Sequence, residues 1–437
     1  MPDLSRRQNQ IVKSISDINL PEAEPTEMAI QEHAADKAGM HYDIRFNING
    51  KAVSFATKKG LPEAPGAPRL LIRQPDHVID YMNWEGTIPK GEYGAGSVKL
   101  YDKQPVVITQ TDKDKLHIHI PKGPNSGNFT IFKTNDDKWL AVKNKELPRT
   151  WESRPDYKKA TRDLADMPED LYMASRKYDG AHFIADFTDK GVALTSQNLG
   201  VSGSLIPRED NYPHLKYTKI PKDLVGTVLR GELHHPKGFN ILSAMTIANP
   251  VKSLKMQQEH GKPEFIPFEV VRYQGKDFSQ FTPEERIKIV DDVANAIPNS
   301  YIKPPERKRA SESLRDFYER VVANNGEGIV LQDRTTGEFL KKKNRLDYDL
   351  KIKDVLEGDG RLKGSMGSLV LIDNSDTEVG NVGTGFSDAL RKEIFENKNK
   401  YIGQLVKITS DKPVVAKSLR GPAFAGFTID KSTPDLL

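Results

Sequence analysis

The segment from Leu171 to Phe187 places the tightest constraint on how this chain folds. A short apolar run ends at Lys177-Tyr178-Asp179-Gly180, and apolar side chains then recur with a period of two as far as Phe187. The pattern predicts two strands joined by a tight turn, because Asp-Gly accepts the positive φ that such turns need. A lysine that ends a strand can point into a cleft, where desolvation or a neighbouring cation lowers its pKa and makes it a nucleophile. A surface lysine in a hairpin is the alternative, and the tetrapeptide alone does not exclude it.

The composition limits the chain to a few classes of protein. Its 437 residues suffice for two to four domains, and the absence of cysteine excludes disulfide scaffolds, cysteine nucleophiles and thiolate metal sites. No apolar run reaches the length of a membrane span, and the N-terminus lacks the apolar core of a signal peptide. We therefore expect a cytoplasmic protein with no membrane partner. The net charge of +4 is compatible with a nucleic-acid partner.

The first 148 residues predict an arm followed by a small β domain. Residues 1–27 are polar, and Pro21 and Pro25 indicate a mobile arm or a short helix with a linker. From residue 28 to 148 several short strand patterns indicate a β barrel or sandwich, with tight bends at Gly86, Gly91, Gly94 and Gly96.

Polar side chains gather at two places in this β domain. His41, Asp43 and Arg45 alternate along one predicted strand and so project to one side of it, and His77 and Tyr81 follow in a second polar stretch. Imidazole and carboxylate suit Mn²⁺ or Zn²⁺, and arginine suits a phosphate. Ordinary polar residues at the edge of a β domain are the alternative reading.

The motifs HYDIRF, PDHVIDY and WEGTIPKGEYGAG resemble the 3′-phosphoesterase domain of bacterial end-joining DNA ligases. That family trims 3′-phosphates and terminal ribonucleotides from DNA ends. The interval between the first two histidines is two residues longer here than in the family, as if Ala38-Gly39 were inserted. The resemblance implies a manganese site made of His33, His41, Asp43 and His77, with Arg45 and Tyr81 on the phosphate.

The chain from residue 149 to 355 predicts a larger α+β domain. Pro148, Trp151 and Pro155 indicate a linker, and Thr282-Pro283-Glu284-Glu285 is a capping box that starts a helix. A second helix is predicted to end near Gly326 as its C-terminal cap.

Five side chains on the predicted strands of this domain offer chemistry that a lysine nucleophile needs. Two lysines could neutralise a triphosphate and lower the pKa of Lys177, two glutamates could hold Mg²⁺ or a ribose hydroxyl, and a phenylalanine could stack on a purine. In isolation each has a plainer reading as a core, strand-end or surface residue. These side chains are Lys351 and Lys353, Glu232 and Glu327, and Phe268.

Their order and type resemble the adenylation domain of ATP-dependent DNA ligases. The matching motifs are KYDGAH, SQNLG, LRGELHH, PFEVVRY, EGIVLQD and DLKIKD. The resemblance implies that Lys177 forms a covalent lysyl-AMP with ATP and Mg²⁺. It assigns Asp179, Gly180, Glu232, Phe268, Glu327, Lys351 and Lys353 to ATP binding, with Glu232 and Glu327 also as Mg²⁺ ligands.

The sequence departs from that family at three positions. His182 and Gln197 stand where the family has arginines that contact phosphate or nicked DNA, and we assign both to DNA contact with weaker charge complementarity. Ser175 replaces a glutamate that is frequent near the adenine.

Residues 356–437 predict a small barrel of the oligonucleotide-binding (OB) type, or another small β domain. Short strands, a helix capped by Ser387 and the motifs KGSMGSLVL, VGTGFSD and SLRGPAFAGFTIDK resemble the OB domain of the ligases. The last motif normally reads Arg-x-Asp-Lys, but here Thr428 stands in place of the arginine. The resemblance leaves Lys431 to assist pyrophosphate departure, and we assign Arg420 to DNA.

Together these observations predict an α+β multidomain chain. We expect an N-terminal β barrel, a central nucleotidyltransferase domain of ATP-grasp-like antiparallel sheets with helices, and a C-terminal OB barrel. The expected activity is ATP-dependent sealing of nicked double-stranded DNA through lysyl-AMP and DNA-adenylate, by a monomer of bacterial or viral origin. The alternatives are an RNA ligase or another nucleotidyltransferase with this lysine motif, and a DNA-end-binding protein that has lost catalysis.

Overall fold

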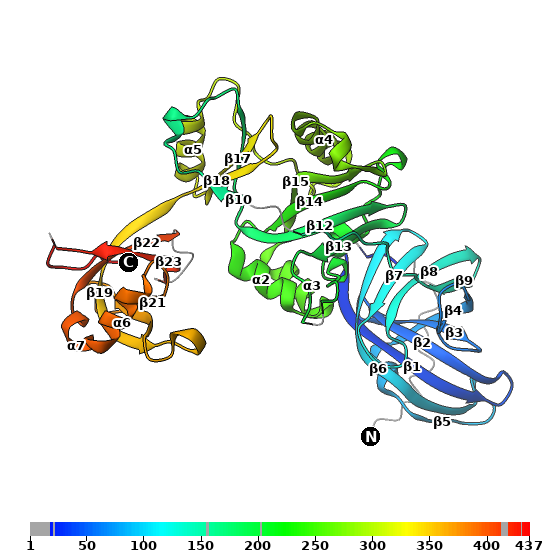
Figure 1. Cartoon of the computed structure of the whole chain (residues 1–437). Coiled ribbons are helices and arrows are strands. Elements are labelled where there is room, and N and C mark those ends of the chain that lie inside the picture. Colours follow the sequence, from blue (N-terminus) through cyan, green and yellow to red (C-terminus); the bar gives the residue numbers. More distant parts are fainter. Residues whose placement is uncertain (1–17, 21, 154–156, 202, 412–417, 430) are drawn as a thin grey trace. The chain divides into compact units, whose positions relative to one another are not determined.

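A computed structural model describes residues 18–20, 22–153, 157–201, 203–411, 418–429 and 431–437. The chain divides into two compact units (Figure 1). The first comprises Met1–Arg154, Gly180–Phe281 and Glu285–Pro304, and the second comprises Pro155–Asp179, Thr282–Glu284 and Pro305–Leu437. Most of the predicted N-terminal arm lies outside the described residues, but residues 24–27 belong to the first strand. Within the described ranges, no helix is long and apolar enough to cross a membrane.

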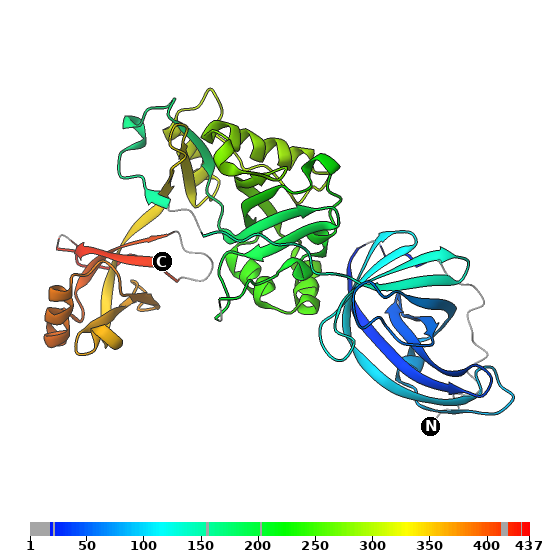
Figure 2. The same ribbon diagram turned by 45° about the vertical axis from the view of Figure 1, so that its right-hand side comes forward.

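The N-terminal part of the first unit is a closed β barrel, which confirms that prediction. Its sheet has the strand order β1-β2-β3-β4-β9-β8-β7-β6-β5, and pairing of β1 with β6 closes the ring (Figure 2). The strands are β1 (Glu24–Ala35), β2 (Gly39–Ile48), β3 (Lys51–Thr57), β4 (Arg69–Val78), β5 (Gly86–Ile88), β6 (Gly96–Asp112), β7 (Lys115–Ile120), β8 (Gly127–Asn135) and β9 (Lys138–Lys143), with the 3₁₀ turn η2 (Ile79–Asn83).

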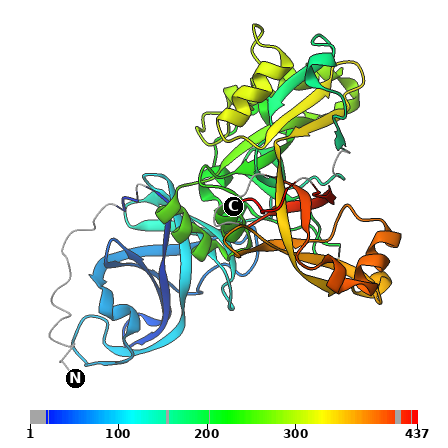
Figure 3. The same ribbon diagram turned by 90° about the vertical axis from the view of Figure 1, so that its left-hand side faces the viewer.

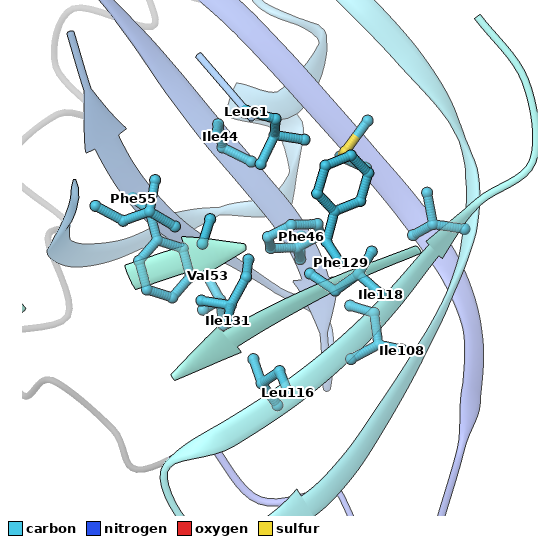
Figure 4. Close-up of a cluster of buried hydrophobic side chains, with 14 of the residues drawn as sticks. Ile44, Phe46, Val53, Phe55, Leu61, Ile108, Leu116, Ile118, Phe129 and Ile131 are labelled. Atoms are coloured by element: carbon cyan, nitrogen blue, oxygen red, sulfur yellow. The ribbon is translucent and has the colours of Figure 1, made fainter. Parts of the chain in front are cut away.

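Alternation of apolar side chains along these strands fills the barrel. Ile44 and Phe46 on β2, Val53 and Phe55 on β3, and Ile131 on β8 are all buried in one cluster (Figure 4). Each large side chain of this kind stabilises the fold by roughly 1.5–3 kcal/mol. All four glycines at which bends were predicted have positive φ, from 78° at Gly94 to 155° at Gly86.

The rest of the first unit is built on a five-stranded antiparallel sheet of order β13-β12-β14-β15-β16. Its apolar face packs against helices from the same unit, and the cluster contains Phe183, Phe187 and Leu229. The helices α2 and α3 and the single-turn helix α1 were not predicted. The elements are β12 (Gly180–Thr188), β13 (Gly191–Ser196), η4 (Glu209–Asn211), α1 (Pro213–Lys216), η5 (Lys222–Leu224), β14 (Val228–His234), α2 (Phe239–Ile247), α3 (Pro250–His260), β15 (Glu264–Tyr273), β16 (Lys276–Asp277), η6 (Phe278–Gln280) and α4 (Pro283–Ala296).

The second unit contains two sheets. A four-stranded sheet of order β10-β18-β17-β11 packs with α5, and a five-stranded antiparallel sheet of order β21-β20-β19-β22-β23 forms the C-terminal part. The elements are β10 (Tyr157–Lys159), η3 (Leu164–Asp166), β11 (Tyr172–Arg176), α5 (Leu314–Ala323), β17 (Gly328–Asp333), β18 (Phe339–Lys343), β19 (Arg345–Glu357), η7 (Gly360–Leu362), β20 (Met366–Ile372), β21 (Glu378–Val382), α6 (Asp388–Glu396), α7 (Lys398–Tyr401), β22 (Leu405–Asp411) and β23 (Arg420–Phe427).

The structure corrects the predicted hairpin around Lys177. β11 pairs with β17, whereas β12 pairs with β13 and β14, so the lysine segment connects two sheets. Gly180 does not have positive φ in this connection. A Cβ there would lie 2.1 Å from the carbonyl oxygen of Leu233, so glycine is needed for close approach.

The cap of α5 differs from the prediction, whereas the predicted domain boundary at residue 355 stays a prediction. The helix α5 ends at Ala323, and the residue with positive φ after it is Asn325 (58°) instead of Gly326. The expected domain boundary at residue 355 falls inside β19, whose thirteen residues belong to the C-terminal sheet from Arg345 onward.

Candidate active sites

Lys177 lies directly after β11, beside the start of β17. Its backbone N–H donates to the carbonyl oxygen of Gly328 at 2.9 Å, and its ammonium group is 2.5 Å from a carboxylate oxygen of Glu327. The pairing of β11 with β17 therefore fixes both backbones of this ion pair. The alternative interpretation of Lys177 as a surface lysine in a hairpin is wrong. Its side chain is only 21% exposed and is paired with a partly buried carboxylate.

Lys343 at the end of β18 completes this cluster, and sequence reasoning missed it. Its Nζ is 2.9 Å from the second carboxylate oxygen of Glu327 and 2.8 Å from Asp411. Burial alone would raise the pKa of Glu327, but Lys177 and Lys343 outweigh it and hold this pKa below its usual value. The strand FLKKK, in which Lys341 and Lys343 alternate after an apolar start, was the available signal.

The two lysines predicted to bind phosphate lie elsewhere. Lys351 pairs with Asp376 at 2.9 Å and Lys353 pairs with Glu378 at 2.9 Å, on β19 of the C-terminal sheet. Both acidic partners are more than half exposed, so these are surface ion pairs of small energetic weight. The structure thus places Lys343, and not Lys351 or Lys353, beside the Glu327 carboxylate.

Two cations of the C-terminal sheet have acidic partners. The guanidinium of Arg420 forms a bidentate pair with Asp179, and its hydrogen bond to Asp179 raises the pKa of Arg420. Lys431 donates to Asp435 at 2.5 Å and to Asp349 at 3.2 Å. The Arg420 guanidinium is therefore engaged by Asp179 of the lysine motif, and the DNA contact predicted for Arg420 stays a prediction.

The remaining predicted nucleotide ligands lie on the five-stranded sheet of the first unit. Glu232 on β14 is directly opposite His182 on β12, and the His182 ring meets Phe268 edge to face at a centroid distance of 5.1 Å. Beside Phe268, Glu269 forms a buried ion pair with Arg230.

Gln197 does not face solvent where DNA could reach it. The residue is only 7% exposed, and its side-chain amide donates to the carbonyl oxygen of Glu152 at 2.8 Å. Its own carbonyl oxygen accepts from Trp151 Nε1 at 3.1 Å. Gln197 therefore fastens the segment that follows the barrel, and its predicted DNA contact stays a prediction.

The barrel brings three metal-ligating side chains together at one end of the β1–β2 hairpin. His33, His41 and Asp43 offer ligand atoms that all lie within 4.8 Å of one another. His33 is directly opposite His41 in the register, and the longer interval between them is absorbed in the turn at residues 36–38. His33 is oriented by the Gly94 carbonyl oxygen, 2.8 Å from its Nε2.

The electrostatics of this cluster keep its carboxylate ionised. Burial tends to raise the pKa of Asp43, but Arg45 and the histidines outweigh it and hold this pKa below its usual range. A hydrogen bond to Asp43 raises the pKa of His33. Two imidazoles and one ionised carboxylate are a donor set that suits Mn²⁺ or Zn²⁺, so these residues fit the metal that the resemblance implies.

Arg45, His77 and Tyr81 form a second group beside the metal cluster. The Arg45 guanidinium lies 3.0 Å from Asp43, 3.1 Å from His77 Nδ1 and 4.8 Å from the centre of the Tyr81 ring. His77 stacks on Tyr81 at 5.0 Å. Burial and Arg45 lower the pKa of His77 to about 4, so the imidazole is neutral at neutral pH. Although His77 was predicted as a metal ligand, the structure places it against Arg45 and Ser54.

Comparisons with known proteins match three successive segments of the chain. Residues 31–133 match the family described as the DNA Ligase D 3′-phosphoesterase domain, residues 155–353 match the ATP dependent DNA ligase domain, and residues 357–427 match the DNA ligase OB-like domain. This chain is an ATP-dependent DNA ligase homologue with a LigD-type N-terminal domain. The predicted central nucleotidyltransferase and C-terminal OB-type domains are confirmed.

The ligase homologue has curated relatives that are longer than itself. The multifunctional non-homologous end joining DNA repair protein LigD of Mycobacterium tuberculosis H37Rv is 27% identical over 381 residues, which cover 82% of this chain and 47% of that protein. LigD of Pseudomonas aeruginosa is 24% identical over 439 residues, or 84% of this chain and 50% of that protein. The chain thus spans about half the length of the curated relatives it matches.

Solved ligase structures also match the ligase homologue. A Lig E DNA ligase structure aligns with a TM-score of 0.49 and 19% identity, covering 64% of this chain and 100% of that one. The ligase domain of M. tuberculosis LigD aligns with a TM-score of 0.35 and 18% identity, covering 63% and 95%.

Proposed function

We propose that this chain seals nicks with a 5′-phosphate and a 3′-hydroxyl in double-stranded DNA, using ATP and a covalent AMP on Lys177. The observation that carries the proposal is the cluster of Lys177, Glu327 and Lys343 on three successive strands of one sheet. It provides a nucleophile, a carboxylate and a fixed cation within one small volume. Positioning and charge stabilisation of this kind are what phosphoryl transfer requires.

In the first step the Lys177 nitrogen attacks the α-phosphorus of ATP. Its ammonium must first lose a proton, and the Glu327 carboxylate at 2.5 Å is the acceptor within reach. An N–P bond forms while the bond to the bridging oxygen breaks, and its electron pair leaves with pyrophosphate. Lys343 holds a positive charge beside the same carboxylate, where it can stabilise phosphate oxygens.

The next two steps move AMP to the DNA and release it. An oxygen of the DNA 5′-phosphate attacks the α-phosphorus, the N–P bond breaks, and the nitrogen takes up a proton again. The 3′-hydroxyl oxygen then attacks the 5′-phosphorus, loses its proton and expels AMP. Glu327 and Glu232 are the proposed Mg²⁺ ligands, and bound Mg²⁺ would neutralise phosphate charge in each step.

Sealing of a labelled nicked duplex tests this proposal directly. We expect ligation with ATP and Mg²⁺, none with GTP or NAD⁺, and a rate that falls steeply with added salt because phosphate contacts release counterions. Sealing of nicked RNA with no DNA activity would favour the RNA ligase alternative. Tight binding of nicked DNA without sealing would favour the end-binding alternative, which the replacements at His182, Gln197 and Thr428 motivate.

We propose a second activity for the barrel, the Mn²⁺-dependent removal of 3′-phosphates from DNA ends. His33, His41 and Asp43 would hold the metal, which polarises the phosphate, while Arg45 and Tyr81 would bind its oxygens. We further propose that the barrel grips the DNA substrate of the ligase, and that the protein works as a cytoplasmic monomer.

Replacing His41 by alanine tests the barrel activity. The variant should lose at least ~10-fold in Mn²⁺-dependent 3′-phosphate release, because one of the three ligands is gone, while sealing of a clean nick should be unchanged. His260→Ala, a partly exposed histidine outside the barrel, is the matched control. Equal phosphate release by wild type and His41→Ala would contradict the metal site.

A further inference from the structure

A buried polar cluster joins the barrel to the five-stranded sheet domain within the first unit. The barrel contributes His117 and His119 from β7 and Asn128 from β8, and the sheet domain contributes Asp210, Lys216 and Tyr217 from η4, α1 and the residue after it. We call these six residues the junction cluster. None of them belongs to the sites described above.

Lys216 is the centre of the junction cluster. The residue is only 7% exposed, and its Nζ donates to Asp210 at 2.6 Å and to Asn128 of the barrel at 3.1 Å. Asn128 in turn donates to Asp210 at 3.3 Å, and His119 Nδ1 is 3.4 Å from the same carboxylate. A buried ammonium group is costly unless it is paired and hydrogen-bonded, so this lysine depends on an acceptor that the barrel provides.

His117 adds an aromatic contact across the same junction. Its ring stacks on Tyr217 with a centroid distance of 4.1 Å and an interplanar angle of 15°. Both ring nitrogens are satisfied inside the barrel, at 3.0 Å from the hydroxyls of Thr111 and Thr130. Burial lowers the pKa of His117 to about 3, which keeps the stacked ring uncharged at neutral pH.

A second contact zone is separate from the junction cluster. Helix α3 packs against β1 and β6 of the barrel, and its Val251 and Leu254 share a small apolar cluster with Val107 (Figure 3). Gln258 donates to Glu24 at 3.1 Å at the edge of this zone. Contact at a single zone would leave the barrel able to rotate about that zone. Two separate contact zones restrict this rotation of the barrel relative to the sheet domain.

The covalent connection between the barrel and the sheet domain is also fastened. Arg149 makes a bidentate pair with Glu209, and both the backbone and the hydroxyl of Thr150 donate to Asp186. Flexible connections between domains usually have few such contacts. The linker was predicted at residues 148–155. Its described part, residues 149–153, is therefore held against the sheet domain.

From these contacts we infer that the barrel is a fixed part of the ligase body, locked through the junction cluster, and not a tethered module. The lock holds the barrel in one orientation on the sheet domain. Its functional consequence rests on the proposed grip of the barrel on DNA: the barrel presents its DNA-binding surface in one fixed orientation on the sheet domain, so nicked DNA binds without a separate docking step of the barrel.

Distances between two spin labels test the lock without reference to any activity. The chain has no cysteine, so Lys58→Cys in the barrel and Asp189→Cys in the sheet domain can be labelled alone at two exposed positions. Lys58→Cys with Lys99→Cys gives a reference pair inside the barrel. We expect one distance distribution as narrow as the reference. A broad or multimodal distribution in the otherwise unchanged chain would overturn the lock.

Substitutions on the barrel side then show which contacts make the lock. His117→Ala combined with Asn128→Ala should at least double the width of the cross-domain distribution and leave the reference pair unchanged. Lys133→Ala, on an exposed position of the same strand as Asn128, is the matched control. A reference pair that also broadens would signal a misfolded barrel, and Tyr217→Ala, which leaves the barrel sequence intact, then takes its place as the decisive variant. An unchanged width in a folded variant would overturn the role of the junction cluster.

Kinetics separate the lock from the proposed function. With the lock released, the KM for nicked duplex should rise several-fold, while the rate of lysyl-AMP formation without DNA stays at the wild-type value. Absence of lysyl-AMP in wild type would defeat the proposed ligase function and leave the distance result standing. An unchanged KM with a broadened distribution would overturn the inferred use of the lock in DNA binding.

Discussion

Lys177→Arg is expected to abolish AMP capture while the protein stays folded. Arginine retains the positive charge beside Glu327, but a guanidinium does not lose its proton in proteins and cannot act as the nucleophile. After incubation with ATP and Mg²⁺, the intact mass of wild type should increase by one AMP, and the mass of Lys177→Arg should not change. Bound AMP must first be removed with pyrophosphate, because a protein that is already adenylated gains nothing.

Two further variants make this result specific to Lys177. Lys177→Ala should behave like Lys177→Arg, whereas Lys158→Ala, which removes an exposed lysine from the same sheet, should capture AMP normally. Capture of AMP by Lys177→Arg would mean that another lysine is the nucleophile. Capture of GMP or NAD-derived AMP by wild type would instead correct the cofactor and keep the lysine.

The second large effect is expected at Lys343, which the sequence motifs did not single out. Lys343→Met should slow lysyl-AMP formation by ~10² or more, the usual cost of removing a positioned donor for developing phosphate charge. Lys351→Met and Lys353→Met should remain within about twofold of wild type, because their partners Asp376 and Glu378 form exposed pairs on another sheet. Single-turnover measurement of lysyl-AMP formation compares the three variants.

A control is needed because Lys343 also pairs with Asp411 of the C-terminal sheet. Asp411→Asn removes that second partner and keeps Lys343 beside Glu327. Near-normal AMP capture by Asp411→Asn together with slow capture by Lys343→Met would assign the effect to the phosphate. The reverse pattern, in which Lys351→Met and Lys353→Met are slow and Lys343→Met is normal, would restore the assignment from the sequence.

Period-two alternation predicts a strand where one of its faces is buried, as on β7, whose burial alternates along its whole length. His41, Asp43 and Arg45 lie on β2 as expected. Alternation cannot show which strands pair. The separation of β11 from β12 into two sheets, and the pairing of β1 with β6, depend on contacts between residues far apart in sequence.

Helices α2 and α3, which were not predicted, show that a helix can carry a clear start signal without a clear apolar periodicity. Asn249 caps α3 by accepting from the Lys252 N–H at 2.9 Å, and Pro250 occupies the first turn. This Asn-Pro pair is a recognised helix start. Only a few side chains of α2 and α3 are buried, so their apolar pattern is too weak to identify a helix.

The site residues were predictable in type but not always in position. A Lys-x-Lys pattern occurs both at Lys341–Lys343 and at Lys351–Lys353, and nothing in either pattern states which strand lies next to Glu327. Gln197 follows a strand, at a place where a DNA contact was predicted. Trp151 and Glu152, which lie far from it in sequence, take up its hydrogen bonds. In both cases the deciding information is the tertiary path of the chain.

The connection between the two sheets of the second unit is unusually short. β18 ends at Lys343 and β19 begins at Arg345, so Asn344 alone joins them, and its N–H donates to the Glu327 carbonyl oxygen at 2.8 Å. The apolar clusters of the two sheets share no residue among those described. The pairs that bridge them, Arg420 with Asp179 and Lys343 with Asp411, are ionic. Such a joint lets the two sheets rotate about a few backbone dihedrals without exposing apolar surface. The ionic pairs that oppose this rotation weaken as ionic strength rises.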